Sequence, residues 1–158
     1  MNVRPILLAE DNEDDVFFMQ RALKACGIVH PMHVAPHGQA AIDYLSGVNG
    51  HADRVKHPLP FLVFLDLKMP HKSGLEVLEW IRRQPHLQTM LVLILTTSRE
   101  ESDVQRAYRL GANSFLVKPP NGSQLTDLMR LVKAYWLDNP QLAFSPPGGT
   151  ATEVADAR

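Results

Sequence analysis

The sequence predicts an α/β protein built on a doubly wound, five-stranded parallel sheet with five helices. Short apolar runs alternate with amphipathic helical patterns, and two of the runs, 61–65 and 91–95, are apolar at every position. Apolar runs of this length are typical of strands that are buried on both faces, as in a parallel sheet. Alternation of such strands with helices favours right-handed crossovers, which place helices on both faces of the sheet.

The five expected strands are short. They lie at residues 6–9, 32–35, 61–65, 91–95 and 114–117. The segment 47–58 has little apolar content and carries Gly47, Gly50 and Pro58. Because glycine and proline interrupt regular structure, we expect a long surface loop there.

Five helical patterns follow the strands, and each has a boundary signal. They lie at about 12–26, 39–46, 75–84, 100–110 and 123–136. Asp11 or Asn12 offers an N-cap for the first helix, and Gly27 ends its pattern. Asn121 or Ser123 can cap the last helix.

Composition points to one ordinary globular domain. The chain has 158 residues, 45% of them hydrophobic and 21% charged, with a net charge of −1. There is no overall basic field to attract nucleic acid or an anionic membrane, and the longest apolar runs are too short to span a bilayer. The lone Cys26 and the lack of a signal-peptide pattern favour a cytoplasmic protein. We expect a folded domain at 1–137, then a C-terminal arm and flexible tail at 138–158.

Polar side chains follow four of the predicted strands. Glu10 and Asp11 follow the first strand, Asp66 the third, Thr96 the fourth and Lys118 the fifth. The carboxyl ends of parallel strands meet at one edge of the sheet, so these groups should lie together. Each alone could be a turn or capping residue. That four strands end in polar groups at the same edge by accident is a weaker explanation.

Crowded carboxylates require a positive charge. The stretch AEDNEDD is followed at a distance by Asp66, and we expect Glu10, Asp11 and Asp66 to share one cation. Hard oxygen ligands at a shallow, open edge suit Mg²⁺. The other acids of the stretch fall in the first helical turn, where negative charge favours the helix dipole; they are Glu13, Asp14 and Asp15.

A cation beside a carboxylate, a hydroxyl and a lysine predicts phosphoryl transfer. Asp66 can attack as a carboxylate nucleophile and form an acyl phosphate. Mg²⁺ would neutralise charge on the transferring oxygens, and Lys118 and Thr96 would hold the remaining ones.

Four motifs, in this order, closely resemble the receiver domain of the two-component response-regulator family. They are Glu10-Asp11, Asp66-Leu67-Lys68-Met69-Pro70 with Gly74, Leu95-Thr96, and Phe115-Leu116-Val117-Lys118-Pro119. Any one of them is weak evidence, whereas the set is highly specific. The resemblance covers about residues 4–136 and implies a flavodoxin-like receiver fold.

The resemblance implies a role for each acidic residue of the site. Asp66 would be the phosphoacceptor. Asp11, Asp66 and the backbone carbonyl of Lys68 would bind the metal, with Glu10 acting through a water molecule.

The resemblance also implies features of the neighbouring strand ends. Thr96 and Phe115 would form a switch pair. The peptide between Lys118 and Pro119 would be cis, which an X–Pro bond tolerates because its trans preference is small.

A sensor histidine kinase is the partner that the resemblance implies, and we expect a signalling protein rather than an enzyme. The long loop 47–58, Lys68 and the segment 95–98 are similar to stand-alone regulators that pair with bacterial phytochrome-type histidine kinases. No DNA-binding domain is recognisable after residue 136. Output should therefore go through protein–protein contact or dimerisation.

Other functions fit the sequence less well. An intermediate phosphoryl shuttle in a phosphorelay would carry the same motifs and stays open. A Mg²⁺-dependent aspartyl phosphatase of the haloacid dehalogenase type needs a second Asp two residues after the nucleophile, where this chain has Lys68. A flavin module would need a phosphate-binding, glycine-rich turn after the first strand. The spacing of His30, His33 and His37 does not favour zinc, because these residues straddle a strand and its two turns.

The last helix predicts a homodimer. The stripe expected to cover the sheet consists of Leu125, Leu128, Met129, Val132, Tyr135 and Trp136. Leu131 and Ala134 add apolar surface off this stripe, and Leu137, Leu142 and Phe144 follow the helix. A monomer rarely exposes such a patch. The alternative is that these residues fold back onto their own domain.

Overall fold

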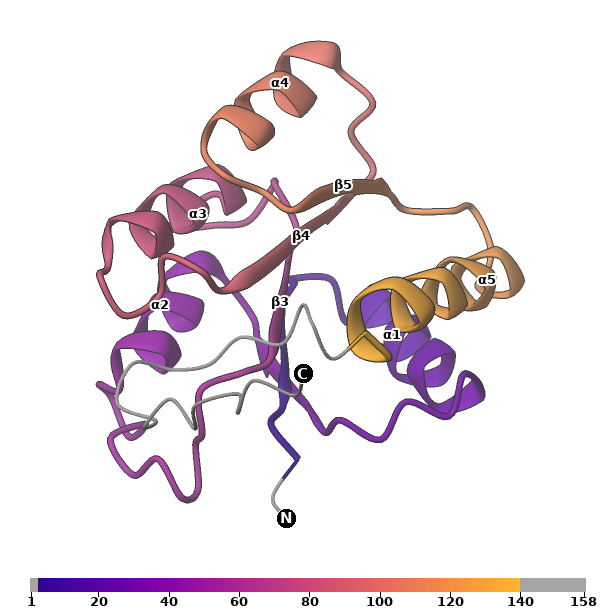
Figure 1. Cartoon of the computed structure of the whole chain (residues 1–158). Coiled ribbons are helices and arrows are strands. Elements are labelled where there is room, and N and C mark those ends of the chain that lie inside the picture. Colours follow the sequence, from indigo (N-terminus) through magenta and orange to yellow (C-terminus); the bar gives the residue numbers. More distant parts are fainter. Residues whose placement is uncertain (1–2, 140–158) are drawn as a thin grey trace, which may run out of the picture.

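The computed structural model describes residues 3–139, which form one parallel sheet between two layers of helices (Figure 1). The strand order is β2-β1-β3-β4-β5, and all neighbouring strands are parallel. The strands are β1 (Ile6–Ala9), β2 (Met32–Ala35), β3 (Leu62–Leu65), β4 (Leu91–Thr96) and β5 (Ser114–Val117). This confirms the predicted doubly wound sheet, in which the winding direction changes between β1 and β3.

Five helices alternate with the strands. They are α1 (Glu13–Ala25), α2 (Gly38–Ser46), α3 (Gly74–Arg83), α4 (Glu101–Arg109) and α5 (Gly122–Val132), and α5 continues into a π-helical turn, η1 (Lys133–Leu137). Asn12 and Asn121 are the N-caps of α1 and α5, since each side chain accepts a backbone N–H three residues further on. The cap on Asn12 starts α1 immediately after the acidic pair, so its first turn lies beside the strand ends.

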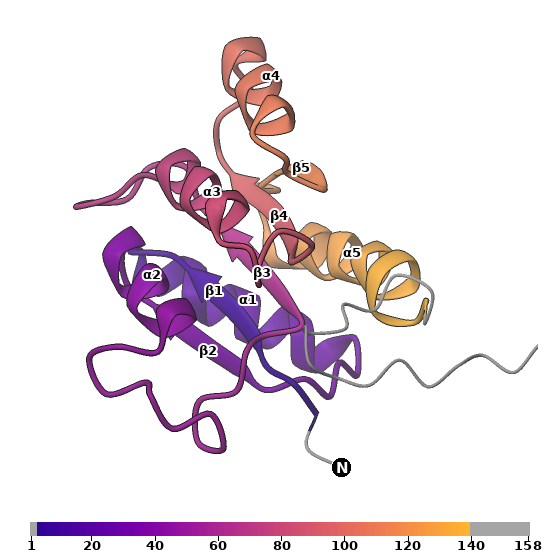
Figure 2. The same cartoon turned by 60° about the vertical axis from the view of Figure 1, so that its left-hand side comes forward.

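Alternate residues of the central strands face opposite helical layers. The side chains that pack with α1 and α5 include Leu8, Phe64 and Leu93. Those that pack with α2 and α3 include Leu7, Val63 and Val92. Figure 2 shows α4 beside β5, at the opposite end of the sheet from β2. Burial on both faces explains why β3 is apolar throughout and why β4 is apolar up to its last residue, Thr96.

The π-helical turn changes which residues at the end of the last helix face the sheet. Burial follows the predicted stripe up to Val132, but Tyr135, which the stripe included, is 61% exposed. A π-helical turn takes more residues than an α-helical one, so side chains after Val132 rotate away from their extrapolated positions. Trp136 still packs against the core. Leu131 and Tyr135 are left as exposed apolar side chains on the same helix, with the exposed Ala134 between them.

Some expectations lie outside the described residues. These are the apolar residues Leu142 and Phe144 and the tail 145–158. Within 3–139, no helix is both long enough and apolar enough to cross a membrane.

Arg54 fastens the long loop after α2 to the body of the protein. Its guanidinium donates to the backbone carbonyls of Tyr44 at 2.8 Å, Leu45 at 2.8 Å and His57 at 3.2 Å. The Tyr44 hydroxyl in turn donates to the Pro58 carbonyl at 2.8 Å. The second half of the predicted loop is therefore bonded to the end of α2.

Three imidazoles, one from β2 and two from the long loop, surround the Tyr44 ring. The rings of His33, His51 and His57 have centroids 4.3, 5.1 and 6.1 Å from that of Tyr44. Burial lowers the pKa of His33, and the neighbouring His51 and His57 lower it further. The packing therefore favours an uncharged imidazole at His33.

Candidate functional site

Three carboxylates meet at the carboxyl edge of the sheet. Glu10 and Asp11 follow β1, Asp66 follows the adjacent β3, and each offers an oxygen within 4.8 Å of the others. Backbone hydrogen bonds fix both strand ends, since the Asp66 N–H donates to the Ala9 carbonyl at 3.1 Å and the Glu10 N–H to the Ala35 carbonyl at 3.0 Å. Glu10 and Asp66 are buried, whereas Asp11 is exposed. The structure thus brings together the acids that the sequence placed at this edge.

The Lys118 ammonium lies among these carboxylates. It follows β5, two strands away from β3, and its long side chain crosses back to the centre of the edge. Its Nζ donates to Glu10 Oε2 at 2.6 Å, to Asp66 Oδ2 at 2.9 Å and to Asp15 Oδ2 at 2.9 Å. Only 11% of the Lys118 side chain is exposed, so these contacts are largely shielded from water.

Burial and crowding shift the pKa values of the pair formed by Glu10 and Lys118. Burial raises the pKa of Glu10 to about 7; the Lys118 ammonium opposes this rise and the Asp66 carboxylate adds to it. Burial alone would lower the pKa of Lys118, but its hydrogen bonds to Glu10, Asp66 and Asp15 outweigh that effect and raise it. Lys118 is therefore a permanent cation of the site.

Asp15 is a site residue that the sequence analysis missed. It was assigned only to the helix dipole, yet its carboxylate bonds directly to Lys118. No local signal marks this role, because Asp15 contacts Lys118, which is 103 positions away in the sequence.

Two further predicted residues lie near Asp66. Thr96 ends β4, the neighbour of β3, where it is fully buried, and its Oγ1 accepts from the Ser98 N–H at 3.4 Å. The Lys68 N–H donates to Asp66 Oδ1 at 3.4 Å, and the Lys68 side chain is exposed. Thr96 as a catalytic and switch residue and the Lys68 carbonyl as a metal ligand both stay predictions.

Phe115, the other predicted switch residue, connects β5 to α4. It lies opposite Ile94 in the register of β4 and β5, and its partly buried ring packs against the core on the α2 and α3 side. Its N–H donates to the hydroxyl of Tyr108, a half-exposed residue of α4, at 3.1 Å. A movement of Phe115 would therefore act on α4 directly.

The prediction of a cis peptide between Lys118 and Pro119 is wrong for this structure, because residues 3–139 contain no cis peptide bond. An X–Pro bond prefers the trans isomer by only a small free energy, so the motif alone does not determine which isomer is present. The Lys118 side chain reaches Glu10 and Asp66 across a trans bond.

The three histidines considered for zinc do not share a site. His30 bonds to the Arg4 carbonyl, His33 stacks on Tyr44, and His37 caps α2.

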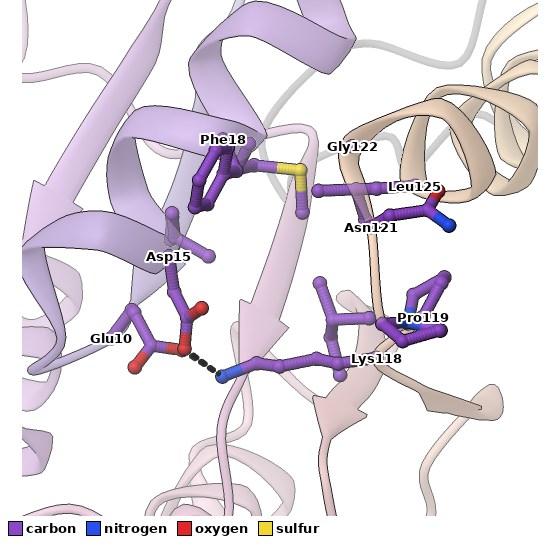
Figure 3. Close-up of a pocket in the computed structure, with 12 residues that line it drawn as sticks. Glu10, Asp15, Phe18, Lys118, Pro119, Asn121, Gly122 and Leu125 are labelled. Atoms are coloured by element: carbon purple, nitrogen blue, oxygen red, sulfur yellow. Dashed lines mark hydrogen bonds and ion pairs between the residues drawn. The ribbon is translucent and has the colours of Figure 1, made fainter.

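A cavity of about 150 Å³ lies beside the Lys118 ammonium, between α1 and the segment that leads into α5. Figure 3 shows Glu10 and Asp15 turned toward Lys118 at one end of it, and Phe18 and Leu125 at the other. The cavity therefore has a charged end next to the carboxylate cluster and an apolar end between the two helices.

The set of donors fits a hard divalent cation. Three carboxylates, those of Glu10, Asp15 and Asp66, bond to one ammonium, and the Asp11 carboxylate lies beside two of them, which leaves the site with an excess of negative charge. Oxygen ligands at an edge that solvent can reach through Asp11 suit a cation that keeps several waters, as Mg²⁺ does.

This combination of a doubly wound sheet, an acidic triad and a lysine defines the class of response regulator receiver domains. The family model for the response regulator receiver domain matches residues 6–130, and the chain belongs to this family.

Similar proteins include regulators of archaea and cyanobacteria. The chain is 37% identical to the probable methanogenesis regulatory protein FilR2 of Methanothrix harundinacea, across 84% of this chain and 83% of that protein. It is 35% identical to response regulator Rcp1 of Synechocystis sp., across 84% of this chain and 88% of Rcp1.

Solved structures of response regulators also match this chain. Mn²⁺-bound Rcp1 matches with a TM-score of 0.78 and 33% identity, over 91% of this chain and 99% of Rcp1. The phosphorylated cyanobacterial phytochrome response regulator RcpA matches with a TM-score of 0.81 and 32% identity, over 92% of this chain and 99% of RcpA.

Proposed function

We propose that this protein is a single-domain response regulator that accepts a phosphoryl group from a sensor histidine kinase on Asp66, in a Mg²⁺-dependent reaction. The observation that carries the proposal is the position of the Asp66 carboxylate. One of its oxygens lies 2.9 Å from the Lys118 ammonium, and the oxygens of Glu10 and Asp11 lie within 4.8 Å. The carboxylate nucleophile thus lies beside a cation and close to further oxygens that would bind a metal.

The proposed step is a displacement at phosphorus. An oxygen of Asp66 forms a bond to phosphorus, and the bond from phosphorus to the imidazole nitrogen of the kinase breaks, with its electron pair leaving on the imidazole. Asp11, Asp66 and the Lys68 carbonyl would hold Mg²⁺, with Glu10 acting through water, and the metal would neutralise charge on the transferring oxygens. This arrangement makes Asp66 the only group of the site that changes its bonding.

Lys118 and Thr96 are proposed to receive the phosphoryl group. The ammonium would donate to one phosphoryl oxygen and the Thr96 hydroxyl to another. Thr96 would turn together with Phe115 as a switch pair, and the bond from Phe115 to Tyr108 supports a response in α4.

We propose a phytochrome-type histidine kinase as the partner, a folded receiver domain at 1–137 and a cytoplasmic location. The likeness to RcpA, a phytochrome response regulator, supports the partner, and the lone Cys26 supports the compartment. Output would go through a homodimer, for which the exposed Leu131 and Tyr135 provide apolar surface.

An intermediate phosphoryl shuttle is the alternative function, since it would use the same site. A Mg²⁺-dependent aspartyl phosphatase is disfavoured, because it requires an acid/base carboxylate two residues after Asp66 and this chain has the exposed Lys68 there.

The test is phosphoryl labelling of the Asp66→Asn variant. Wild-type protein, incubated with Mg²⁺ and a small acyl phosphate or a phosphorylated histidine kinase, should gain one phosphoryl group by intact-protein mass spectrometry. Asp66→Asn should gain none, while its circular dichroism spectrum stays the same. The control is Asp127→Asn, an exposed carboxylate on α5, which should label normally. Labelling of Asp66→Asn at the wild-type yield would contradict the proposal.

A further inference from the structure

We propose that Asp15 is a positioning residue that holds the Lys118 ammonium on the α1 side of the site and competes with the phosphoryl group for it. The inference rests on the proposed phosphorylation of Asp66. It concerns how firmly the phosphorylated state is held, rather than whether it forms.

The start of α1 fixes the Asp15 carboxylate. The Asn12 side chain accepts from the Asp15 N–H at 3.0 Å, which keeps Asp15 in the first turn of the helix. From that turn, Asp15 Oδ2 lies 2.9 Å from Lys118 Nζ. Figure 3 shows the carboxylate turned toward the ammonium at the end of the cavity. Because the cap fixes the backbone of Asp15, its carboxylate anchors the Lys118 ammonium on the α1 side.

Each N–H of the Lys118 ammonium is already used. An ammonium has three donors, and Glu10, Asp15 and Asp66 each accept one, at 2.6, 2.9 and 2.9 Å. A phosphoryl group brings about two negative charges and three acceptor oxygens. Lys118 therefore has to give up one carboxylate before it can donate to a phosphoryl oxygen.

Asp15 is the carboxylate that opposes this exchange. Glu10 and Asp66 belong to the group of acids that can share a cation, so a bound metal can offset their charges. Asp15 is not part of that group, and Lys118 is the one cation with which it forms an ion pair among residues 3–139. Its charge also repels an arriving phosphoryl anion. Both effects weaken the hold of Lys118 on the phosphoryl group.

The test compares Asp15→Asn with Asp14→Asn. Both variants remove one negative charge from the first turn of α1, but Asp14 is exposed and does not contact Lys118. The probe is beryllofluoride, a small anion that mimics a phosphoryl group on a carboxylate, titrated with saturating Mg²⁺ and followed by amide NMR. It should bind Asp15→Asn about three- to fivefold more tightly than wild type, as expected for a partly exposed ion pair. Its affinity for Asp14→Asn should stay within about twofold of wild type.

A second readout needs no metal. In the metal-free protein, the ¹H–¹⁵N signal of the Lys118 ammonium should exchange with water faster in Asp15→Asn than in wild type or Asp14→Asn. A merely structural role for Asp15 would leave this signal unchanged.

Two results would overturn the inference. The first is equal beryllofluoride affinity of Asp15→Asn and Asp14→Asn. The second is weaker binding by Asp15→Asn than by wild type, which would mean that Asp15 orients Lys118 for the phosphoryl group. If wild-type protein binds no beryllofluoride and takes up no phosphoryl group, the proposed function falls, and this inference falls with it.

Discussion

Gly74 lies directly against the backbone of Asp66, so that a β-carbon at Gly74 would overlap the Asp66 carbonyl group. The N–H of Gly74 also donates to the Leu67 carbonyl at 3.0 Å. The first residue of α3 therefore supports the turn that carries Asp66, the proposed phosphoacceptor, and only a residue without a side chain fits there.

Gly74→Ala should destabilise the protein and slow its phosphorylation. The added methyl group has to push the Asp66 backbone away, at a cost of roughly 1–3 kcal/mol in the free energy of unfolding. Chemical denaturation measures this cost. The matched control is Gly122→Ala at the start of α5, where a β-carbon meets nothing within 4 Å, so stability should not fall. A Gly74→Ala protein as stable as wild type would show that the contact is easily relieved.

Arg82→Ala should be one of the most destabilising changes of a charged residue on α3. The Arg82 guanidinium donates to the carbonyls of Met90 at 2.7 Å and Gly111 at 2.7 and 3.0 Å, and to Asn113 Oδ1 at 3.0 Å. These bonds join α3 to the segments that precede β4 and β5. Their loss should lower the free energy of unfolding by roughly 2–4 kcal/mol, measured by urea denaturation.

The neighbouring Arg83 provides the control for this experiment. Its ion pair with Glu79 is solvent-exposed, with 74% and 44% of the two side chains accessible. Arg83→Ala should therefore change the stability by less than about 1 kcal/mol. Similar losses in both variants would refute the account given for Arg82.

The contribution of His33 to the free energy of unfolding should decrease as the pH falls below the ordinary pKa of histidine, 6.5. Burial lowers the pKa of His33 in the folded protein, so the unfolded chain binds a proton at a pH where the native imidazole stays neutral. Unfolding then takes up protons, and the free energy of unfolding rises with pH through this window. Denaturation between pH 5 and about 7.5 should show a smaller slope in His33→Phe than in wild type. His86→Phe, at an exposed position, is the control. Equal slopes of the free energy of unfolding against pH in wild type and His33→Phe would count against the prediction.

Asp11→Ala should weaken Mg²⁺ binding and slow phosphorylation. Asp11 is the solvent-exposed acid of the cluster with Glu10 and Asp66. Its removal would delete a direct ligand in the proposed metal site. We expect a loss of affinity of about tenfold or more, the range seen when even supporting residues of a metal site are removed. Without metal, the variant should be slightly more stable, because repulsion among the carboxylates decreases. Isothermal titration calorimetry with Mg²⁺ measures this affinity, and Glu13→Ala is the control. Equal affinities for wild type and Asp11→Ala would exclude Asp11 as a ligand.

Leu131→Glu should shift the protein toward the monomer. Leu131 and Tyr135 are 68% and 61% exposed, so a charge at Leu131 would disturb an interface without disturbing the core. Light scattering at micromolar concentration should give a dimer mass for wild type and a lower mass for Leu131→Glu and for a chain truncated after Leu137. Val55→Glu, at an 82% exposed position in the long loop, should remain dimeric. A monomeric wild-type protein, with and without beryllofluoride, would exclude this mode of output.

The sequence predicted the features of the fold that depend on local pattern. Strands buried on both faces need apolar side chains throughout, and the run at 61–65 shows this pattern. The caps at Asn12 and Asn121 follow from side chains that can accept a backbone N–H. The convergence of Glu10, Asp11 and Asp66 followed from topology alone, because parallel strands end at the same edge.

What the sequence missed depends on side chains that reach across the structure. The contact from Lys118 to Asp15 joins residues 103 positions apart, and no local signal marks it. The gathering of His33, His51 and His57 around Tyr44 results from how the long loop folds back. Tyr135 was misplaced because α-helical spacing was extended into a π-helical turn.

The bond between Phe115 and Tyr108 also has a consequence for assembly. β5 is an edge strand of the sheet, and the open side of such a strand can template pairing with another chain. The Tyr108 hydroxyl accepts the N–H of the second of the four β5 residues, so a foreign strand would lack that donor. Other molecules should therefore meet this end of the sheet through the side chains of α4 and not by adding a sixth strand.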